Sequence, residues 1–469
     1  MTMISRHLAR GLLGASALAL ALAGPALADS IFTPSADVFT GSVNAGGAER
    51  GVPVYPGSDA VISGDALTPG QQVTLIRGTT VLNADGPLTV NPEGKLSFGL
   101  TVDEDAVPGV HPIVVIAENP AAATVVDLKI SPRIPLSGED KFTVESAPVT
   151  RGLYQIAYSP VSDALFVTSA VGRPPVTESS LIKIDPRTLE TVASASPAAA
   201  PARPDGSDGG VFAVYGVDVD DTNGHVWVTN PRQNTAAVYS QDDLSLVRQF
   251  DPGAVPHPRD VVIDETRSRA YLSTSFEGRI EVFDTATLEQ LAPIEITSTI
   301  RRGQFGARSA DLDAEAGKLF TVSISTPEVA VVDLDSGEVR VLPLSGIIDA
   351  SDTAYDRQEG LIFVVAQGSD NLLIVKEETG EILHDIDIGA SPLSVTFDPQ
   401  TRLALVANRG SDTLTAVTPQ GEIVANLDGG SYPNQIRVLR DGAVYAVNKS
   451  RGENDERGDR ISRIRPAAE

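Results

Sequence analysis

The sequence of 469 residues contains no cysteine, which excludes disulfide bonds, thiolate metal ligands and cysteine nucleophiles. Histidine is also scarce. Besides His7 near the start there are four, at positions 111, 225, 257 and 384, and no two of them have the spacing of a zinc or copper site. No GxSxG, P-loop or HExxH string occurs. We therefore expect no catalytic set, no metal and no cofactor.

Positive charge and long apolar runs are the next shortages. The chain carries 36 Lys and Arg against 62 Asp and Glu, a net charge of −26 that opposes binding of nucleic acid at long range. Its most apolar run, residues 11–22, follows Arg6 and Arg10, is too short to span a bilayer and precedes the small-residue site Ala26-Leu27-Ala28. Residues 1–28 thus read as a signal peptide cleaved after Ala28. We expect a periplasmic protein without membrane insertion.

The remaining sequence shows two different patterns that predict β-strands. Residues 29–135 contain short alternating runs separated by Pro-Gly, Asp-Gly and Glu-Gly turns, which is typical of an antiparallel sandwich. The strings LTPGQQVTLIRG, NPEGKLSFGLTV and VPGVHPIVV resemble small immunoglobulin-like domains. The segment 131–140, SPRIPLSGED, reads as a linker into the second domain.

Residues 136–469 are dominated by a repeated unit of four short strands. The second strand is the clearest signal, as in LFVTS at 165, VWVTN at 226, IFVVA at 362 and ALVAN at 404. Seven such units of roughly 40 to 60 residues predict a seven-bladed β-propeller. The first strands align at Ile156, Val217, Val261, Ala310, Thr353, Val395 and Ile436.

The seventh unit has only three strands of its own. A ring left open there would expose a strand edge. The segment 141–149, in which Phe142 and Val144 alternate with polar residues, is placed to supply the missing outer strand. The sequence therefore predicts a ring closed by the start of the domain.

The propeller part also resembles a known family. RGLYQIAYSPVSDALFVTSAVGR, LIKIDPRTLETV and the final loop NKSRGENDERGDRISRIRP resemble the YncE-type exported propellers, within the class named for YVTN repeats. The resemblance covers residues 142–466. It implies a periplasmic seven-bladed protein with no established catalytic set, for which single-stranded DNA has been proposed as a ligand. The strong acidity and the additional amino-terminal domain depart from that family.

Cationic residues recur where the strand connections meet the mouth of the central channel. Guanidinium groups and aromatic rings together suit phosphates, carboxylates or bases. The competing interpretation is that these arginines brace neighbouring blades through nearby acids. The candidate rim residues are Arg151, Arg173, Arg232, Arg259, Arg308, Arg409, Lys449, Phe305 and Tyr432.

Three functions remain open from the sequence. The leading hypothesis is a non-enzymatic exported binding or scaffold protein that presents this rim to a protein or a small anionic ligand. The alternatives are a single-stranded DNA-binding propeller and a metal-dependent enzyme resembling lactonases or lyases. The loop Asp218 to His225 has oxygens at a spacing that suits calcium, but its Asn223-Gly224 pair favours a plain hairpin turn.

Overall fold

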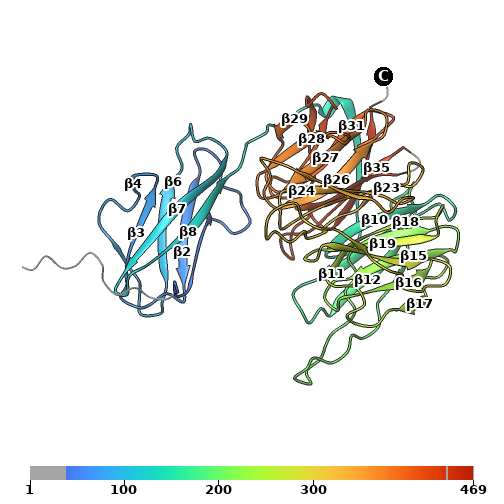
Figure 1. Cartoon of the computed structure of the whole chain (residues 1–469), viewed down its shortest axis with the longest axis horizontal. Helices are drawn as coiled ribbons and strands as arrows, with labels where there is room; N and C mark the ends of the chain where they lie inside the picture. The colour runs from blue at the N-terminus through green and yellow to red at the C-terminus, as the bar shows by residue number, and fades with distance from the viewer. Residues whose placement is uncertain (1–37, 440–441, 468–469) are drawn as a thin grey trace, which may run out of the picture.

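A computed structural model describes residues 38–439 and 442–467; the expected signal peptide and its cleavage site lie outside them. The described chain is all-β, as predicted, and forms a small amino-terminal sandwich beside a large ring of sheets (Figure 1). Its one helical element is the short 3-10 turn η1 (Glu139–Lys141). No helix in the described ranges is long and apolar enough to cross a membrane.

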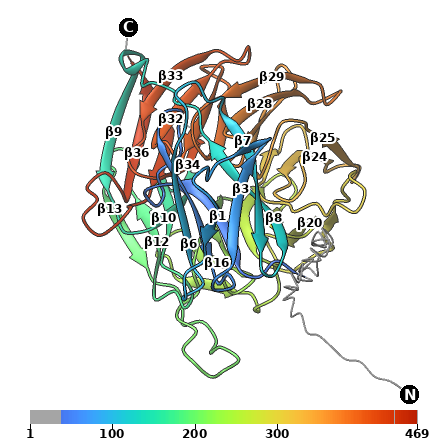
Figure 2. The ribbon, with the colours of Figure 1, turned by 90° about the vertical axis from the view of Figure 1, so that its left-hand side faces the viewer.

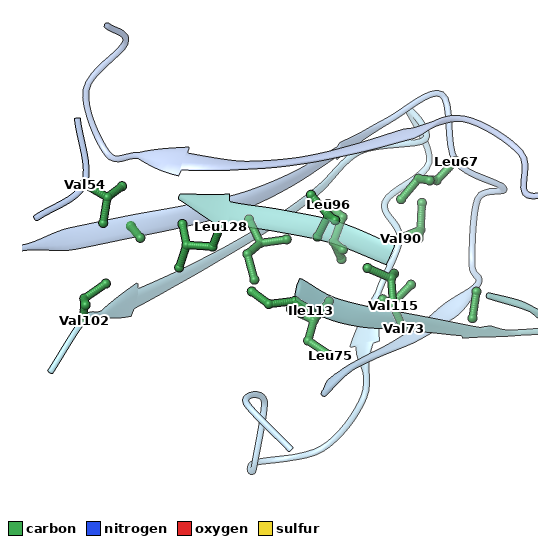
Figure 3. Packing of buried hydrophobic residues seen from close by; sticks show 14 of the residues in the cluster. Val54, Leu67, Val73, Leu75, Val90, Leu96, Val102, Ile113, Val115 and Leu128 are labelled. Carbon is green, nitrogen blue, oxygen red and sulfur yellow. The ribbon is translucent and has the colours of Figure 1, made fainter. Parts of the chain in front are cut away.

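The amino-terminal domain consists of two antiparallel sheets with an apolar core between them. Strand β7 shows why: Ile113, Val115 and Ala117 are buried, whereas the residues between them face outward. Figure 3 shows Ile113 and Val115 among the core side chains, together with Leu128 of the same sheet and Leu96 of the opposite sheet. The first sheet is β1 (Ser42–Gly47), β2 (Asp59–Asp65) and β6 (Leu96–Thr101); the second is β4 (Thr80–Val81), β3 (Gln72–Arg77), β7 (Gly109–Glu118) and β8 (Ala122–Ile130), with β5 (Leu88–Thr89) on β3.

The second domain is a propeller of seven four-stranded sheets, each running outward from the channel. Blades 1 to 3 are β10 (Leu153–Ser159), β11 (Ala164–Val171), β12 (Glu178–Ile184) and β13 (Thr191–Ala195); β14 (Val217–Asp220), β15 (His225–Asn230), β16 (Thr235–Ser240) and β17 (Leu246–Gln249); and β18 (Pro258–Asp264), β19 (Arg269–Thr274), β20 (Arg279–Asp284) and β21 (Ile294–Glu295). Blades 4 and 5 are β22 (Asp311–Asp313), β23 (Lys318–Val322), β24 (Glu328–Asp333) and β25 (Val339–Pro343); and β26 (Ala350–Asp356), β27 (Leu361–Ala366), β28 (Asn371–Lys376) and β29 (Ile382–Asp387). Blades 6 and 7 are β30 (Pro392–Asp398), β31 (Leu403–Asn408), β32 (Thr413–Val417) and β33 (Ile423–Asp428); and β34 (Pro433–Val438), β35 (Val444–Asn448), β36 (Arg460–Pro466) and β9 (Phe142–Pro148).

Burial of both faces explains the nearly continuous apolar second strands. Every residue of β27 and of β31 is buried, because each blade is covered by a neighbour on both sides. Between blades 5 and 6 the rings of Phe363 and Phe397 stack with centroids 5.0 Å apart. Such contacts repeat around the ring, and the innermost strands of successive blades touch until β34 meets β10.

Side chains of the innermost strands tie each blade to the next. Gln155 in β10 accepts from the backbone N–H of Val217 at 3.1 Å, and Gln435 in β34 accepts from that of Ile156 at 2.6 Å. Carboxylates do the same elsewhere: Asp218 accepts from Ile263 at 2.9 Å and Asp352 from Val395 at 3.0 Å. The ring around the channel is therefore a structural network of buried acceptors.

The outer strand of blade 7 comes from the start of the domain. Strand β9 pairs antiparallel with β36 over seven residue pairs, from Phe142 opposite Pro466 to Pro148 opposite Arg460. The side chain of Arg463 in β36 is also ion-paired with Glu145 in β9. The first and the last strand of the propeller sequence thus lie in one sheet, and this pairing closes the ring.

The sandwich lies against one face of the propeller, and Figure 2 shows it in front of the blades. The ammonium of Lys129 in β8 donates to the Asp370 carboxylate at 2.6 Å and to the Gln367 carbonyl at 2.7 Å. On the other side of this contact, Arg451 donates to the Gly51 carbonyl at 3.2 Å. Gly51 leaves no room for a side chain, because an added Cβ would lie 2.2 Å from the hydroxyl of Tyr432. The domains therefore share a defined polar contact at the face that carries the candidate rim.

Candidate functional site

A cavity of about 330 Å³ opens where the channel meets the loops of the sandwich-facing side of the ring. Its walls come from the starts of innermost strands and from the connections that follow second strands. Tyr154 and Arg259 are of the first kind, and Arg232 and Arg409 are of the second. Gln367, whose carbonyl receives Lys129, also lines it. The cavity thus lies beside the domain contact.

Five cationic side chains from five blades gather at this cavity: Arg232, Arg259, Arg308, Arg409 and Lys449. The four arginines line it, and the ammonium of Lys449 lies 2.8 Å from the centroid of the Tyr154 ring, itself part of the wall. Among the described residues none of the five forms an ion pair with a carboxylate, although the chain holds many such pairs elsewhere. The cluster is therefore unneutralised by direct contact.

The few contacts these cations make are with neutral groups. Arg232 Nε donates to the Tyr215 hydroxyl at 3.0 Å, and an Nη of Arg409 donates to the side-chain oxygen of Asn434 at 2.7 Å. The Nε of Arg308 is buried without a hydrogen-bond partner in the described structure, and the Arg259 side chain makes no hydrogen bond there. A buried donor without an acceptor costs stability, so these positions are suited to an acceptor from outside the chain.

Two aspartates also line the cavity, and both of their carboxylates already accept hydrogen bonds from backbone N–H groups. Asp260 accepts from its neighbour Val261 at 3.0 Å and, across the blade boundary, from Ala310 at 3.2 Å. Asp352 likewise accepts from Thr353 and Val395, both at 3.0 Å. The two carboxylates are thus held in the inter-blade network, and no ion pair joins them to the arginines in the described residues.

Burial and neighbouring positive charge lower the pKa of several groups at the site. Desolvation, followed by the charge of Arg259, lowers the pKa of Arg308 to about 9. Desolvation also lowers the pKa of Lys449 well below its usual range, and Arg409, Arg232 and Arg259 lower it further. Desolvation and the charges of Arg232 and Arg308 lower the pKa of His257. The site is therefore electropositive within an acidic protein.

Aromatic rings stand among these charges. The rings of Tyr154 and Tyr215 lie 3.8 Å apart between centroids, and Arg409 lies over the Tyr432 ring at 5.0 Å. Phe276, beside His257, remains 56% exposed at the mouth. These faces hold the guanidinium groups in place and leave an apolar surface at the opening.

Three of the candidate rim residues lie elsewhere. Arg151 lies outside the cavity, where its exposed side chain faces Glu178 at 3.8 Å, and Arg173 lies outside the cavity as well. The expectation for Phe305 is corrected, because this ring is 1% exposed and packs in the core between blades 3 and 4. Loop position places a residue near the rim, but the direction of its side chain decides what it reaches.

Other residues of the wall were missed by sequence reasoning. Tyr215 lies two positions before the aligned Val217, as Tyr154 lies before Ile156, Arg259 before Val261 and Arg308 before Ala310. This recurrent position was the signal that could have found it. No feature of the repeat indicated that Gln367 lines the cavity or that the amino-terminal domain lies beside it.

Most carboxylate oxygens of the loop considered for calcium already accept hydrogen bonds, although Asp221 Oδ2 is buried without a partner in the described structure. Asp220 accepts from the backbone and the side chain of Asn223 at 3.1 and 2.7 Å, and Asp221 accepts from the side chain of Gln241 at 3.0 Å. In the described residues no group of three or more acidic or histidine side chains is placed to hold a metal ion.

Comparison with known proteins gives sequence relatives and structural neighbours. No family model matches the sequence. Two relatives are both named "Uncharacterized protein YncE": the one from Escherichia coli K12 is 21% identical over 323 residues, and the one from E. coli O157:H7 is 20% identical over the same length. Each alignment covers 64% of this chain and 83% of the relative.

Solved structures with this fold include a Kuenenia stuttgartiensis hydrazine synthase chain and a streptogramin B lyase. The first has a TM-score of 0.51 at 17% identity and covers 63% of this chain and 92% of its own. The second has a TM-score of 0.53 at 14% identity, over 71% and 100%. Identities this low concern the fold alone. The likeness in sequence, together with the propeller fold, confirms the expected resemblance: this chain is similar to the YncE-type β-propeller family.

Proposed function

We propose that the chain is an exported, non-enzymatic binding protein whose propeller holds a small anionic ligand at the mouth of its channel. One observation carries the proposal: four arginines from four blades line one cavity, with Lys449 behind the Tyr154 ring, and none of the five has a carboxylate partner among the described residues. Arg259, Arg308 and Arg409 are half-buried and Arg232 is exposed, and a partly desolvated charge gains from a partner of opposite charge. An anion bound in the cavity would supply that missing partner.

The arginines at the other end of the channel favour this reading over simple bracing. There, Arg357 is ion-paired with Asp313 and Glu315, and Arg402 with Asp356 and Glu359. Bracing between blades in this protein therefore uses direct contact with acids. The cations of the cavity lack such contacts in the described structure, and Arg409 reaches the next blade through the neutral side chain of Asn434 instead. This difference favours ligand binding over bracing.

The fold does not decide between binding and catalysis, because the structural neighbours include proteins named as a synthase and a lyase. We propose binding on the grounds that the wall is built from cations and rings. Single-stranded DNA is the less favoured ligand, since the net charge of −26 repels a polyanion over the rest of the surface.

The test is replacement of Arg232, Arg259 and Arg409 together by Ala. Thermal unfolding of the native chain with citrate or inorganic phosphate, against chloride at equal ionic strength, should show a rise in melting temperature. The triple variant should lose this rise while its own melting temperature stays close to that of the native chain. No rise with either anion, or a large fall in the melting temperature of the ligand-free variant, would contradict the proposal and favour bracing.

A further inference from the structure

The charges that line the cavity bear on how much negative charge the ligand carries. Four arginines line it, at positions 232, 259, 308 and 409, and so do two aspartates, at positions 260 and 352. His257 also lines it, and its lowered pKa keeps the ring neutral at neutral pH. The wall therefore carries two more positive than negative charges in a chain whose net charge is −26.

The two aspartates are not free to offset that excess at closer range. Each spends its two oxygens on backbone N–H groups, one of them in the next blade. Arg437, deeper in the channel, acts on both of them: its raised pKa results in part from Asp260 and Asp352, together with Asp218 and Asp311. The charge of Arg437 is also offset by Asp218 and Asp311, and Asp352 acts on Arg259 and Arg308 as well. The excess of two positive charges on the wall is therefore the net charge that a ligand meets.

Arg259 is the arginine of this group whose charge acts on three of the other cations. Its charge lowers the pKa of Arg308 in the next blade and of Arg409 and Lys449 across the mouth. Cations that repel one another through a common neighbour can be neutralised by one ligand placed among them. A singly charged ligand would leave part of the repulsion in place.

We infer that the ligand of this cavity is a small dianion, a dicarboxylate or a phosphate monoester, held by arginines from opposite sides of the mouth. The inference rests on the proposed anion binding and adds the charge of the ligand. A cavity of about 330 Å³ is large enough for a compact metabolite and too small for a folded partner. Guanidinium forks suit carboxylate and phosphate oxygens equally, so the two sources share one chemistry.

The experiment compares three probes by isothermal titration calorimetry on the full chain at constant ionic strength. Benzoate and benzene-1,3-dicarboxylate share a ring and differ by one carboxylate, and phenyl phosphate places two charges on one group. Both dianions should bind more tightly than benzoate by about tenfold or more. The tighter of the two identifies the source as a dicarboxylate or a phosphate monoester.

The matched variants are Arg259→Gln and Arg151→Gln. Arg259 makes no side-chain hydrogen bond in the described structure, so its replacement should leave the fold intact, which far-ultraviolet circular dichroism and the melting temperature would check. It should weaken the dianions by about tenfold and benzoate by less. Arg151→Gln, an exposed residue outside the cavity, should change neither.

The outcomes separate the two proposals. Equal affinity for benzoate and for both dianions would overturn the dianion inference and leave anion binding standing. Equal weakening of all three probes by Arg259→Gln would also overturn it. An absence of binding for all three probes would overturn both proposals.

Discussion

At the scale of single residues, the channel places acids where their environment opposes ionisation. Asp311 in β22 is the clearest example, because desolvation raises its pKa to about 7, with Arg437 acting in the opposite direction and Asp352 adding to the rise. Asp352 itself has a pKa raised to about 6, first by desolvation and then by Asp260. These carboxyls accept hydrogen bonds across blade boundaries, so their charge is a cost of closing the ring.

The sign of the pH effect follows from these shifts. A carboxyl whose pKa is higher in the folded than in the unfolded chain stabilises the fold at low pH, and this contribution is lost as the pH rises through the folded pKa. For Asp311 the loss falls between about pH 4 and pH 7. Replacing Asp311 by Asn removes the charge and keeps an acceptor for the backbone N–H of Tyr355.

We therefore expect Asp311→Asn to gain stability relative to the native chain as the pH rises from about 5 to about 8.5, by about 2–3 kcal/mol. Urea unfolding followed by tryptophan fluorescence measures the difference. Asp352→Asn is the comparison, and its gain should level off about one pH unit lower. A constant difference at every pH would contradict the raised pKa of Asp311.

Lys449 gives a second prediction at this scale. Its pKa is lowered by desolvation and by three arginines, and Asp459 acts in the opposite direction. An anion bound in the cavity would offset the arginines, so the pKa of Lys449 should rise and protons should be taken up on binding. Titrations of benzene-1,3-dicarboxylate in two buffers of different ionisation enthalpy, at about pH 8.5, should give different heats. Lys449→Met should make the two heats equal; identical heats in the native chain would contradict proton uptake.

At the scale of elements, strand β9 is the one that belongs to another part of the sequence. It covers β36 over its whole length, and without it the last blade would present a row of unpaired backbone groups. A chain that begins at Thr150 should therefore aggregate or melt at least about 10 °C below a chain that begins at Leu136. Differential scanning calorimetry and size-exclusion chromatography of the two truncations decide this. Equal solubility and equal melting temperatures would mean that β9 is dispensable.

Elements were the scale at which the sequence was most informative. Second strands such as β27 and β31 are apolar throughout because both faces are buried, and the repeat of these strings made the blades visible. The alternation of Phe142 and Val144 likewise pointed to an outer strand. The cavity was only half visible: the repeated cations could be found, but Phe305 and Arg151 occupy similar places in sequence and point elsewhere. Side-chain direction depends on tertiary packing that no single repeat contains.

At the scale of the whole molecule, the sandwich and the propeller meet through few side chains. Lys129 is the main one, since it joins Asp370, the Gln367 carbonyl and Ser391, at 2.6, 2.7 and 3.3 Å. The side chain of Asp370 is 2% exposed, so this ion pair is screened less than one at the surface. The position of the sandwich beside the cavity depends on it.

We expect Lys129→Ala to loosen the domains with little change in the melting temperature of the propeller. Small-angle X-ray scattering should show a larger radius of gyration, and limited proteolysis should cut sooner within residues 131–140. Lys95→Ala, on another part of the sandwich, is the control and should leave both measurements unchanged. Unchanged scattering in Lys129→Ala would show that the remaining contacts, such as Arg451 to Gly51, suffice.

The closure of the ring also fixes when this protein can fold. Phe142 and its partner Pro466 are separated by almost the entire propeller sequence, so the seventh blade has no complete sheet until the last strand of the chain has been delivered. If the chain crosses a membrane amino terminus first, β9 stays unpaired until the six blades between it and β36 have followed. Loop closure over such a distance is slow, and it comes last. Closure of the seventh blade is thereby postponed until the last strand is present, and a chain that stops earlier is left with an open ring.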